Sequence, residues 1–145
     1  MKIIFCDIDG VLNSHLGAQK TGIVGIEEDK VLLLKELIDR THSELVITSK
    51  ARFISEMHED RIKTIERLGV KIRDTFKGGL SPNPKAIECL AYLQNKCENF
   101  DNVLILDDND DDFKVYFKYN FIKVNPVTGL TPEDVKDGID ILGEE

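Results

Sequence analysis

Short apolar runs alternate with longer amphipathic segments along this chain of 145 residues. Continuous apolar runs of this kind are typical of strands buried on both faces of a parallel sheet. We expect strands at residues 2–6, 44–48, 70–72, 103–106 and 121–124. We expect helices over residues 29–40, 54–68 and 84–97, a short one after 112, and a last one after 131. The alternation predicts an α/β fold with a central parallel sheet of about five strands and helices on both faces.

Start and stop signals indicate where several helices begin or end. Asp29 is expected to cap the first helix, and Gly69 is expected to end the second. Thr131 is followed by Pro132 and Asp134, which is the pattern of a capping box with proline at the first helical position. The last helix is therefore predicted to begin directly after Thr131.

The composition is that of an ordinary globular protein, with 41% hydrophobic and 32% charged residues. We expect residues 1–145 to form one domain, with residues 13–28 as a small irregular flap. No apolar stretch approaches the ~18 residues of a membrane span, and the segment before Asp7 is too short for a signal peptide. The three cysteines lack metal-ligand spacing, which favours free thiols and a cytoplasmic location.

The formal net charge of −8 limits the partners that we expect. An acidic surface repels nucleic acid non-specifically and offers no patch for a membrane, although a local basic groove remains compatible with it. Five of the acidic residues are clustered between Asp107 and Asp112, so the imbalance is partly the property of one loop. Net charge therefore disfavours membrane binding and gives no support to nucleic acid.

Two aspartates follow the first expected strand at its carboxyl end. Asp7 and Asp9 are two residues apart, so strand alternation turns both side chains the same way, and Gly10 lets the backbone turn sharply. Thr48 and Asp107 also follow apolar strand runs directly. Because ligands of parallel sheets bind at the carboxyl ends of the strands, we expect these residues to gather at one edge.

These residue types suit phosphoryl transfer, which needs a nucleophile, a proton donor for the leaving oxygen and cations against the phosphate charge. Asp7 is the natural nucleophile and would give an aspartyl-phosphate. Asp9 would protonate the leaving group and then activate water, a role that requires its pKa to rise. Thr48 would bind a phosphate oxygen, with Ser49 as its substitute if the register is off by one. Lys85, in the first turn of its helix, would supply a positive charge.

Carboxylates at two strand ends predict a metal site. Asp7, Asp107, Asp108 and the main-chain carbonyl of Asp9 form a set made only of oxygen ligands. Hard oxygen ligands with room for waters favour Mg²⁺ over zinc. We therefore expect Mg²⁺ as the cofactor.

Further residues near these motifs are assigned weaker roles. Asp111 or Asp112 is expected to support the metal ligands from behind. Asn13 is a candidate for substrate contact. Arg52 is another, although an exposed salt bridge explains that residue equally well.

The segment Asp7-Ile8-Asp9-Gly10-Val11 resembles the first motif of the haloacid dehalogenase (HAD) superfamily. The superfamily's other three motifs have counterparts in the expected order, across nearly the whole chain, at Thr48, Lys85 and Asp107-Asp108. Three details are similar to the small HAD domains associated with RNA-repair proteins: the first motif's continuation to Asn13, the Thr48-Ser49-x-x-Arg52 stretch and Gly129-Leu130-Thr131.

The resemblance implies a three-layer Rossmann-like fold and Mg²⁺-dependent phosphatase chemistry, with Asp9 pointing to phosphatase rather than dehalogenase action. The gaps between the motifs are largely used by the fold's own helices, so we expect no large cap domain. An open site suits a polynucleotide end or a phosphoprotein, and it also suits a small substrate covered by the flap or by a second subunit. The alternatives are a phosphatase dedicated to polynucleotide ends or phosphoproteins, and a non-catalytic module that binds phosphate or a partner.

Overall fold

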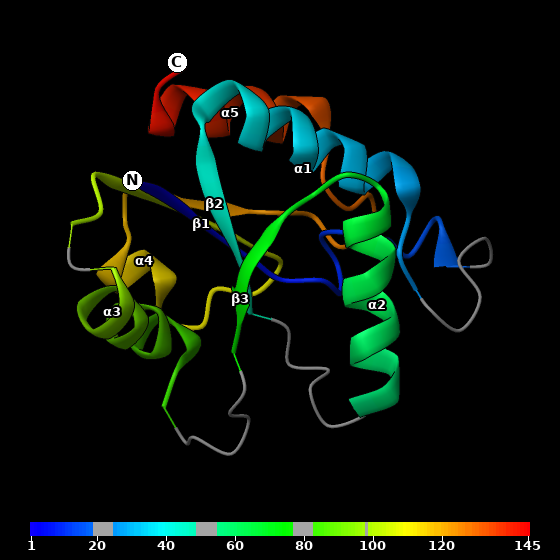
Figure 1. Ribbon diagram of the computed structural model, residues 1–145, viewed down its shortest axis with the longest axis horizontal. Helices are drawn as coiled ribbons and strands as arrows, with labels where there is room; N and C mark the ends of the chain where they lie inside the picture. The colour runs from blue at the N-terminus through cyan, green and yellow to red at the C-terminus, as the bar shows by residue number, and fades with distance from the viewer. Residues whose placement is uncertain (19–24, 49–54, 77–82, 98) are drawn as a thin grey trace.

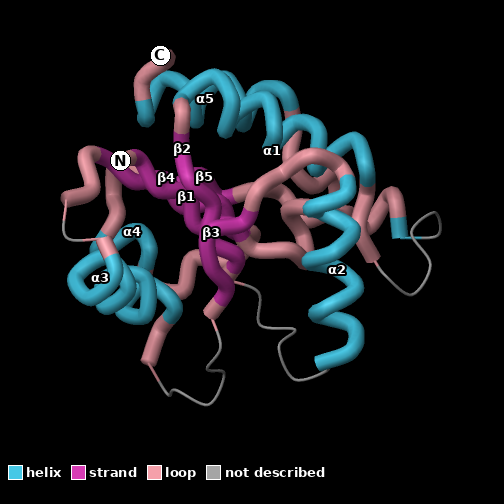
Figure 2. Tube along the Cα trace, in the orientation of Figure 1, coloured by secondary structure: helices cyan, strands magenta, loops and turns pink. Residues whose placement is uncertain are grey.

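The computed structural model describes residues 1–18, 25–48, 55–76, 83–97 and 99–145, with only the backbone described at 55–57. Its centre is a five-stranded sheet in the order β3-β2-β1-β4-β5, in which every neighbouring pair is parallel (Figures 1 and 2). The strands are β1 (Lys2–Cys6), β2 (Ser43–Ile47), β3 (Ile72–Thr75), β4 (Asn102–Asp107) and β5 (Phe121–Lys123). The predicted parallel sheet is confirmed.

Helices cover both faces of this sheet (Figure 1). They are α1 (Glu28–Thr41), α2 (Ser55–Arg67), α3 (Lys85–Lys96), α4 (Phe113–Tyr116) and α5 (Pro132–Leu142). Helices α1 and α5 pack side by side over one face, whereas α3 and α4 lie together on the other. This confirms the three-layer Rossmann-like α/β fold, and no large cap domain is inserted within the described ranges.

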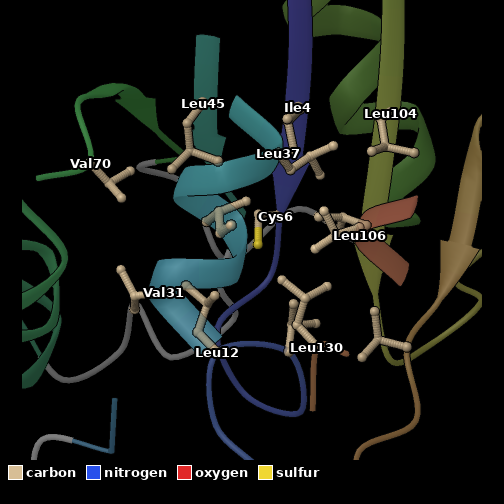
Figure 3. Packing of buried hydrophobic residues seen from close by; sticks show 14 of the residues in the cluster. Ile4, Cys6, Leu12, Val31, Leu37, Leu45, Val70, Leu104, Leu106 and Leu130 are labelled. Carbon is tan, nitrogen blue, oxygen red and sulfur yellow. The ribbon is translucent and has the colours of Figure 1, made fainter. Parts of the chain in front are cut away.

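Each face of the sheet has its own apolar core, because alternate residues of a strand point to opposite faces. Ile4 and Cys6 of β1 pack with Leu37 of α1 in the first core (Figure 3). Ile3 and Phe5 point the other way, into a second core with the helices α3 and α4. Burial on both faces explains why the strands read as continuous apolar runs rather than as alternating ones.

Most boundaries lie within a residue or two of the sequence-based expectation, and the starts of β3 and α1 differ for physical reasons. β3 begins at Ile72, whereas we expected residues 70–72, because Val70 packs into the core before the strand starts. β3 is an edge strand with a register shift opposite Leu45 and Val46, and its polar residues hid it from an apolar search. Glu27 and not Asp29 occupies the N-cap position of α1, although its side chain makes no capping hydrogen bond, and Asp29 lies in the first turn.

The last helix begins as predicted. Thr131 Oγ1 accepts a hydrogen bond from Asp134 N (3.2 Å), and the Asp134 carboxylate accepts one from Thr131 N (3.0 Å). This reciprocal pair is the expected capping box, with Pro132 in the first turn. It fixes the direction in which α5 leaves the segment at Gly129 and Leu130.

Cys6, Cys89 and Cys97 are buried and form no disulfide. Among the residues that the structure describes, no helix is long and apolar enough to cross a bilayer.

Candidate active site

Three of the predicted site residues lie side by side at the carboxyl edge of the sheet. Asp7 follows the central strand β1 and donates its backbone N–H to Leu106 O of β4 (3.0 Å). Thr48 follows β2 and donates its backbone N–H to Cys6 O (3.0 Å). Asp107 is the last residue of β4. The parallel register of β2, β1 and β4 therefore brings together residues that are far apart in sequence.

Gly10 allows the loop after β4 to approach the loop after β1. Its φ angle is +83°, and a Cβ atom at this position would lie 2.5 Å from Asp108 Oδ2. A side chain here would be strained by the backbone and would push the Asp108 carboxylate away. The glycine is therefore needed both for the turn and for the position of Asp108.

The chain near Gly129 holds the same loop from another side. Leu130 N donates a hydrogen bond to Val11 O (2.8 Å), and a Cβ atom on Gly129 would lie 2.8 Å from Asn13 O. This contact explains the structural role of the Gly129-Leu130-Thr131 stretch. Its first two residues support the loop that carries Asp7 and Asp9, and its third caps α5.

Asp7, Asp107 and Asp108 form a compact acidic cluster. One carboxylate oxygen from each lies within 4.8 Å of the others. Lys85 Nζ lies 2.8 Å from Asp107 Oδ2 and 3.3 Å from Asp7 Oδ1, and the lysine is 3% exposed. The structure therefore places the predicted cation of α3 directly against the predicted nucleophile.

Helix α3 is anchored so that Lys85 reaches this cluster. Its first residue donates a backbone hydrogen bond from Lys85 N to Asp111 Oδ2 (2.9 Å). Asp111 thus holds the start of α3, and both Asp111 and Asp112 have positive φ angles just before α4. Support of the metal ligands by Asp111 or Asp112 stays a prediction.

Burial and crowding of like charges control the ionisation of the cluster. Burial raises the pKa of Asp7 to about 7, and Asp107 and Asp108 act in the same direction against the opposing effect of Lys85. Burial and then Asp107 also raise the pKa of Asp108. Burial disfavours the charged form of Lys85, but Asp7 and Asp107 outweigh it and the pKa of the lysine is raised.

The cluster fits a divalent cation. Three carboxylates face one ammonium group, so full ionisation leaves two negative charges without a partner in the cluster. A hard dication bound through carboxylate oxygens and waters would neutralise this excess, and Mg²⁺ prefers such ligands. Asp7, Asp107 and Asp108 are therefore the residues that could hold it.

Asp9 has a different environment from Asp7. Its carboxylate accepts hydrogen bonds from Arg61 Nη1 (3.2 Å) and from Asn13 Nδ2 (3.0 Å), and Arg61 Nη2 lies 3.1 Å from Asp9 Oδ1. Burial opposes ionisation of Asp9, but the hydrogen bonds from Arg61 and Asn13 outweigh it and lower its pKa. The proton donor that we expected needs a raised pKa, whereas these contacts lower the pKa of Asp9.

Asn13 uses its side-chain amide within the loop. Its Oδ1 accepts from Gly10 N (2.8 Å), and its Nδ2 donates to Gly25 O (2.8 Å) as well as to Asp9. These partners organise the turn after β1. Contact between Asn13 and a substrate stays a prediction.

The remaining predicted residues fall in two groups. Thr48 is buried at the end of β2, and its phosphate-binding role, like that of Lys85, stays a prediction. Ser49 and Arg52 lie outside the described residues, as does the part of the flap at residues 19–24.

Arg61 was not found from the sequence. It lies in the α2 segment Ser55–Arg67, where charged residues are frequent and none stands out by spacing. Only the fold shows that its side chain is buried and reaches Asp9, 52 positions earlier in the chain. No local pattern carries a signal for such a contact.

Comparisons with known proteins show the family of this chain and support its fold. The family model described as "HAD domain in Swiss Army Knife RNA repair proteins" matches residues 3–135. No curated protein gives a significant match.

A solved structure entitled "Structure of Pnkp1/Rnl/Hen1 complex" is similar in fold, with a TM-score of 0.57 and 16% identity. The match covers 86% of this chain and 46% of that one, so the chain corresponds to less than half of its structural neighbour. Because the family match extends over most of the sequence, the chain belongs to the family of HAD domains in Swiss Army Knife RNA repair proteins.

Proposed function

We propose that this protein is a Mg²⁺-dependent phosphomonoesterase that works through an aspartyl-phosphate on Asp7. The observation that carries the proposal is the contact of Asp7 with Lys85 inside the cluster of Asp7, Asp107 and Asp108. A carboxylate oxygen, a buried cation and oxygen ligands for a metal then surround the point where a phosphoryl group would sit. Membership of the HAD family supports this assignment.

The first half of the reaction transfers the phosphoryl group to the protein. An oxygen of Asp7 attacks phosphorus, and the bond from phosphorus to the substrate's alcohol oxygen breaks. Asp9 gives its proton to that leaving oxygen. A bound phosphate dianion disfavours the charged form of a nearby carboxyl group, so we propose that Asp9 becomes protonated in the complex.

The second half releases inorganic phosphate. Asp9, now ionised, takes a proton from a water molecule, and that water oxygen attacks phosphorus. The bond between phosphorus and Asp7 breaks, and both carboxyl groups return to their starting states. Thr48 and Lys85 are proposed to bind the phosphoryl oxygens throughout.

Mg²⁺ fits the acidic cluster described above. Asp7, Asp107 and Asp108 would hold it, together with the main-chain carbonyl of Asp9. When bound, it supplies positive charge against the phosphoryl oxygens and offsets the repulsion among these carboxylates.

An assay with an aryl phosphate tests this function directly. We expect turnover with Mg²⁺, loss of turnover in EDTA, and loss in Asp7→Asn, because the nucleophile is removed. Asp137→Asn, an exposed substitution on α5, is the matched control and should turn over like the wild type. Full activity in EDTA or in Asp7→Asn would contradict the proposal. An inert protein that still binds Mg²⁺ and phosphate would favour the non-catalytic module.

The second candidate is a phosphatase dedicated to polynucleotide ends. The family description, which names RNA repair proteins, favours it, and the net charge of −8 counts against it. It predicts a much larger kcat/KM on a phosphorylated oligonucleotide than on the matching mononucleotide. Equal values for the two substrates would reject it while leaving the general phosphatase intact.

We also propose that residues 1–145 act as one HAD-like unit, with 13–28 as a small flap. The three buried thiols, none of which forms a disulfide, support a cytoplasmic location.

A further inference from the structure

We infer that Arg61 of α2 is a positioning residue that holds the Asp9 carboxyl group in the orientation required for proton transfer. This inference rests on the proposed phosphatase function. The two guanidinium nitrogens contact the two carboxylate oxygens separately, Nη1 with Oδ2 at 3.2 Å and Nη2 with Oδ1 at 3.1 Å. A paired contact of this kind fixes the plane of the carboxyl group as well as its distance.

The two partners differ strongly in exposure. The side chain of Arg61 is 6% exposed, whereas that of Asp9 is 55% exposed. Arg61 therefore holds Asp9 from the protein side and leaves the other side of the carboxyl group open to solvent. That open side is where a leaving oxygen or a water molecule would approach.

Helix α2 gives the arginine a firm base. Ile65, one turn further along the helix, is fully buried in the core that also contains Cys6 and Leu45, and Ile62 packs against that core. Asp9 itself lies in a turn next to Gly10, where the backbone alone gives little restraint. Helix α2 thus adds a second restraint on the Asp9 carboxyl group to the hydrogen bond that Asn13 of the same loop donates.

Gly25 also lies next to the Arg61 guanidinium. A Cβ atom on Gly25 would lie 2.9 Å from Arg61 Nη2, and Gly25 has a φ angle of +66°. The carbonyl of Gly25 also accepts from Asn13 Nδ2, which in turn donates to Asp9 Oδ1. Asn13 and Arg61 therefore both donate to the Asp9 carboxylate, and Gly25 lies against both of them, where a side chain would press on the guanidinium.

The test is a series of aryl phosphates whose leaving groups differ in pKa, assayed with Arg61→Gln and Arg61→Lys. Proton donation matters little for a good leaving group and much for a poor one. We expect kcat/KM of Arg61→Gln to fall about 10- to 100-fold on poor leaving groups and by less than about threefold on good ones. Arg61→Lys should lie between wild type and Arg61→Gln, because it keeps the charge but loses the paired contact.

Two more variants separate positioning from a general loss of structure. Arg67→Gln, an exposed substitution on the same helix, should match the wild type on every substrate. Gly25→Ala should reproduce the dependence on leaving group seen in Arg61→Gln, since the added methyl group displaces the guanidinium. Thermal unfolding of each variant checks that the compared proteins are folded.

Equal losses on good and poor leaving groups, or no loss at all, would overturn the inference while the wild type remains an active phosphatase. A wild type that hydrolyses none of the aryl phosphates would overturn the proposed function, and the inference with it. The two failures are therefore distinguishable.

Discussion

Lys85 faces more negative charge than one ammonium group can neutralise. It contacts both Asp7 and Asp107, and Asp108 completes the cluster. Burial, reinforced by the neighbouring carboxylates, raises the pKa of Asp7 to about 7. In an unfolded chain the pKa of an aspartate is about 3.9. Folding without metal therefore favours the protonated form of Asp7.

This difference predicts how stability depends on pH in metal-free protein. The contribution of Asp7 is fully present below its unfolded pKa and is lost as pH rises through its folded pKa, so the window is between about 4 and 7. Asp7→Asn cannot ionise, so its free energy of unfolding should exceed that of the wild type by a margin that grows from pH 5 to pH 8. Denaturant unfolding in EDTA at several pH values measures this margin.

Mg²⁺ should remove the effect, because the metal favours the ionised form of its ligands. Its addition should raise the Tm of the wild type more at pH 8 than at pH 5, and should raise that of Asp7→Asn less. A margin that shrinks with rising pH, or a Tm gain from Mg²⁺ that is larger at pH 5, would contradict this account.

At the scale of elements, local patterns predicted most of the fold. The apolar runs gave β1, β2, β4 and β5 to within a residue or two because those strands are buried on both faces. β3 was misplaced since it is a polar edge strand. The start of α1 was misplaced because no side chain caps it, so the acid at Asp29 was a false signal.

Some residues of the candidate site could be predicted from the sequence and others could not. Asp7, Thr48 and Asp107 follow strand ends, so the topology alone brings them together. Arg61 could not be found, because its contact with Asp9 depends on how α2 packs against the sheet. The local sequence pattern predicts where strands end, but it does not predict contacts between elements that are distant in the chain.

The capping box of α5 allows a prediction at this scale. Thr131→Ala removes the acceptor for Asp134 N and should lower the free energy of unfolding by about 1 kcal/mol. Thr131→Ser keeps the hydroxyl group and should stay close to the wild type. Urea unfolding compares the three proteins, and an alanine variant as stable as the wild type would show that the cap contributes little.

At the scale of the whole molecule, net charge bears on which substrates can approach the candidate site. No large cap domain covers the carboxyl edge of the sheet in the described ranges, and the formal net charge is −8. A polynucleotide substrate would therefore approach against a repulsive field, which salt screens over about 10 Å at 0.1 M.

This predicts an unusual salt dependence for any activity on oligonucleotides. We expect kcat/KM on a phosphorylated oligonucleotide to rise as salt increases from low to moderate ionic strength, because screening weakens the repulsion. The kcat/KM on an aryl phosphate, whose only charged group is its single phosphate, should change less with salt. A steep fall with salt would instead indicate a local basic groove that binds the polynucleotide backbone.

The claim on which the whole account depends is the covalent intermediate on Asp7. Rapid acid quenching of the Asp9→Asn variant during turnover of an aryl phosphate with Mg²⁺, followed by mass spectrometry of its peptides, tests it most directly. We predict a phosphoryl group on Asp7 that accumulates because its hydrolysis is slowed, and none in Asp7→Asn. Turnover without any phosphorylated peptide, or with the phosphoryl group on another residue, would contradict the account.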